Sequence, residues 1–151
     1  MFFRRVKLPL GVTGFLVMCF FVTMNPVETC KALGDPLRWR IVRLVARDAL
    51  CVCELADILG MPQSSVSSHV QVIRRAGLLE SEKCEKWTYF RVQAEFLKLL
   101  KVLDAGNDVP DPAWAEDDRK TRERLAVRES SCCPGPKQIA RSRSSIFSNA
   151  L

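Results

Sequence analysis

Cys51 and Cys53, separated by one residue, are the two side chains in this 151-residue chain whose type and spacing best suit chemistry. Thiolate sulfur is a soft ligand that selects soft ions such as As(III), Sb(III), Cd(II) and Pb(II). A helix is expected to begin at residue 52, and a helix N-terminus lowers the pKa of a nearby thiol. The other interpretation is a pair of small buried hydrophobic residues, a role that free cysteine often takes.

A second close pair, Cys132 and Cys133, lies in a C-terminal region without apolar periodicity. A flexible segment could carry these thiols to Cys51 and Cys53, in its own subunit or in a partner subunit. Alternatively, they could bind a methylated trivalent arsenical unaided, or be incidental thiols of an unstructured tail. The chain has seven cysteines, and such close pairs are poorly suited to structural disulfides. We therefore expect reduced thiols and a cytoplasmic protein.

The elements that must position Cys51 and Cys53 follow from the apolar spacing. It predicts helices over residues 27–33, 36–47, 52–59 and 63–76, strands over 79–83 and 87–92, and a last helix over 94–103. This order is typical of a mainly α winged helix-turn-helix with a small β-hairpin. The last helix carries more apolar residues than one face of a small domain needs, which predicts a dimer.

The helix over residues 63–76 is predicted to contact DNA. Short polar side chains can bond to base edges, and basic ones can bond to phosphates. The predicted polar contacts are Gln63, Ser64, Ser65, Ser67, Ser68, His69 and Gln71, and the predicted phosphate contacts are Arg74 and Arg75 with Lys83 and Lys86 of the hairpin. The alternatives are a solvated helix face and a solvated hairpin tip. No ion is expected to be required for DNA binding.

Three motifs resemble the ArsR/SmtB family of metalloregulatory repressors: residues 32–41 (ALGDPLRWRI), 50–55 (LCVCEL) and 63–70 (QSSVSSHV). The resemblance favours the arsenic-sensing branch. It implies a homodimer that binds double-stranded operator DNA and is released when As(III) or Sb(III) binds cysteine thiolates. The alternatives are a repressor that responds to Cd(II) or Pb(II) and a thiol redox sensor.

The sequence departs from that family at three positions. Ala56 stands where some arsenic sensors have a third cysteine, so a third sulfur must come from elsewhere. Cys84-Glu85 occupies the wing turn, which usually holds a glycine, and Pro62 occupies the usual position of a serine cap.

The spacing of the first pair also predicts a mechanism. In a regular helix, residues i and i+2 point to nearly opposite sides. Cys51 and Cys53 are therefore expected to share one ion only if the start of their helix unwinds or bends. That bend should tilt the DNA-contacting helix, and DNA should weaken ion binding by the same factor.

Composition divides the chain into three regions. The net charge is +6, which suits a small DNA-binding domain. Residues 1–24 are a basic and apolar leader, interpreted as an over-long gene prediction with Met24 as the true start; the alternative is a signal peptide or membrane anchor. Residues 25–103 form the DNA-binding and dimerisation domain, and residues 104–151 a mobile tail with one helix near 113–128. An enzyme is not expected, because Cys-x-x-Cys and a phosphate-binding glycine loop are absent from the sequence.

Overall fold

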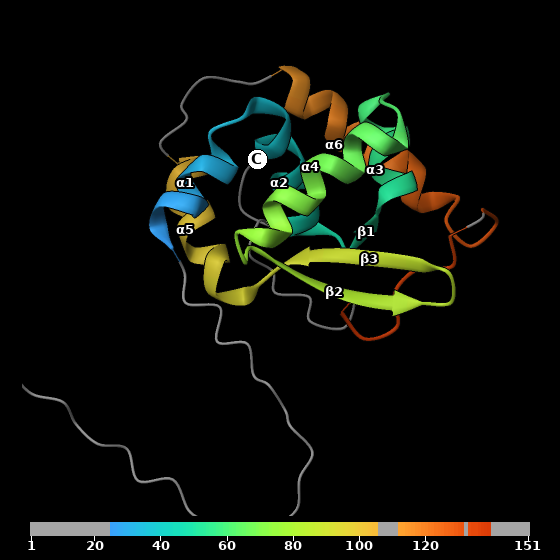
Figure 1. The fold of residues 1–151 in the computed structure, drawn as a ribbon. Coiled ribbons are helices and arrows are strands. Elements are labelled where there is room, and N and C mark those ends of the chain that lie inside the picture. Colours follow the sequence, from blue (N-terminus) through green and yellow to red (C-terminus); the bar gives the residue numbers. More distant parts are fainter. Residues whose placement is uncertain (1–24, 106–111, 132, 140–151) are drawn as a thin grey trace, which may run out of the picture.

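The computed structural model describes residues 25–105, 112–131 and 133–139 (Figure 1). The interpretation of residues 1–24 and the ligand role of Cys132 lie outside this range. The elements follow in the order α1 (Pro26–Leu33), α2 (Pro36–Arg47), β1 (Leu50–Cys51), α3 (Val52–Leu59), α4 (Gln63–Arg75), β2 (Leu79–Cys84), β3 (Trp87–Val92), α5 (Ala94–Ala105) and α6 (Pro112–Ala126). The mainly α winged helix-turn-helix is confirmed.

Local chemistry explains where these helices begin and end. The Asp35 carboxylate accepts a hydrogen bond of 2.9 Å from the Arg38 N–H, and Pro36 occupies the first position of α2. Helix α3 ends at Gly60, whose φ of 65° places it in the left-handed region. Helix α4 begins after Pro62 without a side-chain cap, as the departure from the usual serine predicts.

The apolar core lies between α2, α3, α4, α5 and the sheet. Helix α4 contributes one stripe of fully buried residues at helical spacing, Val66, Val70 and Ile73. Helices α2, α3 and α5 contribute Ile41, Val45, Leu55, Ile58 and Phe96. This shared core fixes α4 relative to α3.

The sheet is larger than the predicted hairpin. It has three antiparallel strands in the order β1-β3-β2, and β1 pairs Cys51 with Tyr89. The apolar spacing predicted no strand between the helices over 36–47 and 52–59, so the strand at Leu50 and Cys51 was not foreseen. Two residues are too few to show the alternation that marks a strand. The strand attaches Cys51 directly to the wing.

The wing turn adopts a strained backbone. Glu85 has a φ of 55°, which lies in the left-handed region at the turn where a glycine is usual. Lys86 completes the turn, and Cys84 pairs with Trp87 where the two strands meet.

Helix α6 confirms the helix expected near residues 113–128 and packs against α3 and α2 (Figure 1). The segment after it, drawn in red, runs towards the wing. The division of the chain at residues 24 and 103 stays a prediction. Among the residues that the structure describes, no helix has the length and apolar character needed to span a membrane.

Candidate thiolate site and nucleic-acid interface

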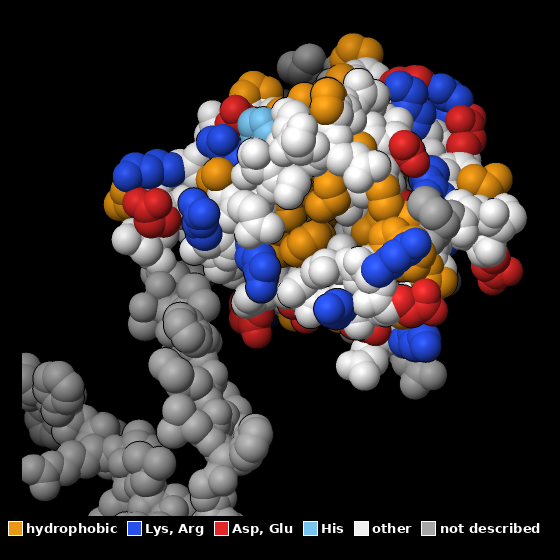
Figure 2. All heavy atoms as spheres, turned by 45° about the vertical axis from the view of Figure 1, so that its right-hand side comes forward, with side chains coloured by type: hydrophobic (Ala, Val, Ile, Leu, Met, Phe, Trp, Pro, Cys, Tyr) orange, Lys and Arg blue, Asp and Glu red, His pale blue; other side chains and the backbone are white. Residues whose placement is uncertain are grey.

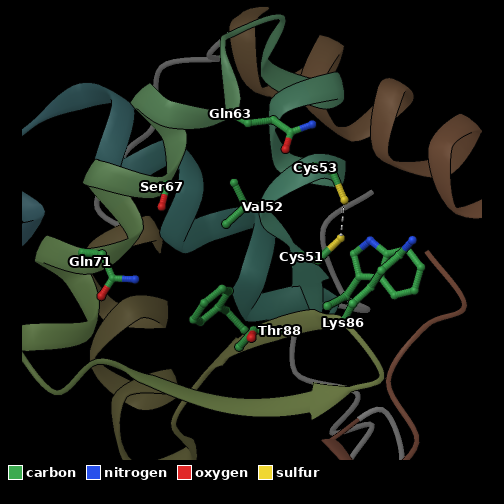
Figure 3. A pocket seen from close by; sticks show the side chains of 10 residues that line it. Cys51, Val52, Cys53, Gln63, Ser67, Gln71, Lys86 and Thr88 are labelled. Carbon is green, nitrogen blue, oxygen red and sulfur yellow. Dashed lines mark hydrogen bonds between the residues drawn. The ribbon is translucent and has the colours of Figure 1, made fainter. Parts of the chain in front are cut away.

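Cys51 and Cys53 already converge. Cys51 precedes α3 with extended backbone (φ −91°, ψ 169°), and Cys53 lies in the first turn of that helix. Their Sγ atoms are 3.0 Å apart (Figure 3). The two sulfurs therefore converge without a bend in α3. Cys51 lies outside the helix in extended conformation, which agrees with the expectation of an unwound helix start.

Cys133 brings a third sulfur to this pair from the same chain. Its Sγ lies 2.9 Å from Cys53 Sγ and 3.5 Å from Cys51 Sγ. Cys51 and Cys133 are buried, and Cys53 is half-buried. We call these three residues the thiol cluster. Cys84 packs nearby in the same apolar group, whereas Cys30 is exposed on α1.

A buried ion pair fixes the start of α3 beside the thiol cluster. The Glu54 side chain is fully buried, and its carboxylate accepts a 3.0 Å hydrogen bond from the Cys51 N–H. The Arg128 guanidinium donates to both carboxylate oxygens, at 2.7 and 3.0 Å, and to the Ala49 carbonyl. Every polar group of this pair that is removed from water thus has a partner. Sequence analysis missed the pair because its members are 74 residues apart.

Burial raises the pKa of the Cys51 thiol, and the hydrogen bond with Cys53 adds to that rise. The expectation of a lowered pKa at the helix start is wrong for Cys51, because loss of solvation outweighs the hydrogen bond from the Glu54 backbone N–H. A soft ion that binds Cys51 must displace this proton.

The segment that carries Cys133 is bonded to the wing. The Gly135 N–H donates to the Tyr89 hydroxyl at 2.8 Å. The Glu82 carboxylate accepts three hydrogen bonds of 2.9 Å from the consecutive N–H groups of Lys137, Gln138 and Ile139. Burial raises the pKa of Glu82, but these three bonds outweigh it and the net pKa is lowered. We call residues 133–139 the strap.

Helix α6 is held by ion pairs. The buried Asp117 carboxylate accepts two hydrogen bonds from Arg40, at 2.6 and 2.7 Å. Asp57 of α3 accepts a bond of 3.0 Å from Arg124. The helix could be predicted from the sequence, but the partners of its charged side chains could not, because they lie 77 and 67 residues away.

The predicted DNA contacts lie on α4 and the wing, and their roles stay predictions. The exposed members are Gln63, Ser64, Ser68, Gln71, Arg74, Arg75, Lys83 and Lys86, and the half-buried ones are Ser65, Ser67 and His69. The His69 ring nitrogen lies 3.9 Å from the Asp35 carboxylate, a neighbour that sequence analysis did not place there. Lysine and arginine side chains surround a face with apolar atoms in its middle (Figure 2).

A groove of about 470 Å³ connects the thiol cluster with the predicted DNA contacts. Cys51 and Cys53 line it together with Gln63, Ser67 and Gln71 of α4 (Figure 3). Lys86, Trp87 and Thr88 line it from the wing. The sulfur atoms therefore lie beside the surface that would face DNA.

The fold and this surface define a winged helix-turn-helix DNA-binding protein with a thiol cluster next to its recognition helix. The family model for the bacterial regulatory proteins of the arsR family matches residues 35–81. A regulator from Methanocaldococcus jannaschii, the uncharacterized HTH-type transcriptional regulator MJ1325, is 33% identical over 51% of this chain and 89% of its own length. The chain belongs to the ArsR family and is a DNA-binding transcriptional regulator.

Two further proteins are similar to this chain. The arsenic resistance transcriptional regulator ArsR1 of Pseudomonas putida is 29% identical over 72% of this chain and 85% of its own length. The homodimeric winged helix-turn-helix domain of Mb0332 from Mycobacterium bovis has a TM-score of 0.53 at 20% identity, covering 66% of this chain and 94% of that domain. The second likeness supports the fold alone.

Proposed function

We propose that this protein is a cytoplasmic repressor that binds operator DNA as a homodimer and is released when As(III) or Sb(III) binds Cys51, Cys53 and Cys133. The observation that supports this proposal most strongly is the convergence of three sulfur atoms, separated by 2.9 to 3.5 Å, at the start of α3. Soft ions prefer such sulfur donors.

The separations of the sulfurs favour one coordination geometry. An ion in the plane of three sulfurs, with bonds of about 2.3 Å, needs sulfurs about 4.0 Å apart. The separations in the thiol cluster are shorter, so an ion whose three bonds point to one side fits better. As(III) and Sb(III) carry a lone pair and bind in this way. Cd(II) commonly takes a fourth ligand, and the described residues bring three sulfurs together.

The face made by α4 and the wing supports operator binding. Gln63, Gln71 and Arg74 are exposed on α4, where side chains can reach a groove of the duplex. Lys83 and Lys86 are exposed on the wing, where they can neutralise phosphates. The groove that links these residues to Cys53 gives an ion a short route to this surface.

Exposed apolar side chains support the homodimer. On α5, Leu99 is 38% exposed, Val102 71% and Leu103 45%, and on α1 Val27 is 58% exposed. Large apolar side chains on neighbouring turns of one helix are costly in water and commonly pack against a second subunit. Sedimentation at several concentrations tests this, with Leu103→Glu expected to yield monomers.

A redox sensor is the second candidate, and the 2.9 Å separation of Cys53 Sγ and Cys133 Sγ favours it. Two thiols this close can form a disulfide on oxidation with little movement. Peroxide would then release DNA by linking the strap to α3, whereas As(III) would have no additional effect on protein already released.

Operator binding measured by fluorescence anisotropy separates these candidates. We expect As(III) and Sb(III) to release DNA from reduced protein, with peroxide having a smaller effect. Cys53→Ser and Cys133→Ser should bind operator like the wild type but resist release. Cys30→Ser is the matched control, because Cys30 is exposed and outside the thiol cluster. Release of all variants at the same As(III) concentration would contradict the proposal.

A further inference from the structure

The strap crosses the sheet along a single row of paired residues. Cys51 of β1 pairs with Tyr89 of β3, and Tyr89 pairs with Glu82 of β2. Residues paired directly across a sheet place their side chains on the same face. The three strands thus offer a thiol, a hydroxyl and a carboxylate in one line.

The strap meets each member of that row in turn. Cys133 lies against Cys51, the Gly135 N–H bonds to the Tyr89 hydroxyl, and the N–H groups of residues 137–139 bond to Glu82. A carboxylate that accepts three consecutive backbone N–H groups fixes that stretch of chain more closely than one side-chain bond can. The position of Cys133 is therefore set from the far edge of the wing.

We propose that Glu82 is a positioning residue for the Cys133 sulfur, and that the strap couples movement of the wing to ion binding at the thiol cluster. The proposal rests on the function proposed above. An ion bound to Cys133 links the strap to Cys51 and Cys53 at the β1 edge of the sheet. Glu82 holds the strap at the β2 edge. The wing is then fixed relative to α3.

This linkage accounts for release without a bend in α3. Lys83 follows Glu82 directly and Lys86 lies in the adjoining turn, so the predicted phosphate contacts move with the strand that the strap holds. A wing fixed by the strap cannot adjust to the DNA backbone. By reciprocity, DNA that displaces the wing weakens ion binding.

A double-mutant cycle on the full chain tests the role of Glu82. Glu82→Gln replaces one acceptor oxygen by an NH₂ group that faces N–H donors. We expect it to weaken As(III) binding about 10- to 100-fold, the range typical when a group that orients a ligand is lost. In a Cys133→Ser background the same substitution should change As(III) affinity less than twofold, because the third sulfur is already gone.

The controls separate positioning from general stability. Glu80→Gln changes a neighbouring carboxylate of β2 and should bind As(III) like the wild type. Glu82→Asp keeps the charge on a shorter side chain and should recover part of the affinity. Without ion, Glu82→Gln should speed hydrogen exchange of the amides of residues 137–139, and Glu80→Gln should not.

The inference would be overturned if As(III) affinity were unchanged by Glu82→Gln, or if the loss were equal in both cysteine backgrounds. Amide exchange at residues 137–139 unaffected by Glu82→Gln would also overturn it, whatever the ion result. Failure of the proposed function gives a different result, since the wild type would then bind operator equally well with and without As(III).

Discussion

Helix α4 and the described residues of the C-terminal segment, 112–131 and 133–139, are held in place by different combinations of forces. Helix α4 buries Val66, Val70 and Ile73 in the common core. The C-terminal segment packs Trp114 and Leu125 against the core and is also held by charged contacts, in which Asp117, Glu54 and Glu82 accept hydrogen bonds from distant parts of the chain. Apolar packing in a core is lost only with the fold, whereas the hydrogen bonds of a half-buried carboxylate such as Glu82 can be exchanged for water. We therefore expect the strap to detach more easily than α4, the helix that is predicted to contact DNA.

Removing apolar volume under α4 should have the largest effect. Ile73→Ala is expected to lower the free energy of unfolding by about 2–5 kcal/mol, because it leaves a cavity in a closely packed core. Denaturant unfolding followed by circular dichroism measures this change. Val72→Ala is the control, since Val72 is 39% exposed on the same helix and should cost much less. Equal losses for both variants would contradict the assignment of the buried face.

Releasing α6 should have an intermediate effect on stability and leave the DNA-binding surface of α4 and the wing intact. Asp117→Asn removes the charge that two Arg40 hydrogen bonds satisfy and should cost about 1–3 kcal/mol. We expect α6 to become sensitive to proteolysis while operator affinity stays within a factor of two. Glu116→Gln, an exposed change on the same helix, should alter neither property. Loss of operator binding in Asp117→Asn alone would show that α6 supports the DNA-binding domain.

Neutralising one predicted phosphate contact should have a smaller, salt-dependent effect. Arg74→Ala should weaken operator binding and reduce the slope of log affinity against log salt by about one. Titrations at several salt concentrations give this slope. Stability should change little, because Arg74 is exposed. An unaltered slope would remove Arg74 from the interface.

Protonation of Glu82 at low pH should detach the strap, and its effect on stability should be the smallest of those predicted. The pKa of Glu82 is lowered from its ordinary value of 4.5, so the folded state gains stability from the carboxylate above pH 4.5. That gain is lost as the pH falls below 4.5 through the lowered value. Amide chemical shifts of residues 137–139, followed by NMR during acidification, should show this step in the wild type. A similar step in Glu82→Gln would assign it to another group.

The sequence predicted the elements whose signals are local. The caps at Asp35 and Pro36, the break at Gly60 and the apolar stripe through Val66 and Val70 each act within a few residues, so the helices and the wing were predicted correctly. The sequence also predicted Cys51 and Cys53 as soft-ion ligands, with Cys132 and Cys133 as one candidate source of a third sulfur. The structure brings Cys51, Cys53 and Cys133 together.

The remaining features depend on contacts between distant residues. Strand β1 is too short to have a pattern, and its pairing with β3 sets the position of Cys51. The Glu54–Arg128 and Glu82–strap contacts span 74 and more than 50 residues, so neither these contacts nor the raised pKa of Cys51 could be inferred from spacing.

The origin of all three sulfurs in one polypeptide has a consequence for dose response. A site assembled between subunits would form only after association, whereas the three sulfurs of the thiol cluster converge within one chain. Under the proposed function, a dimer would carry two self-sufficient sensors. Half-loaded dimers would then exist at intermediate inducer concentrations, unless the two subunits bind the inducer cooperatively.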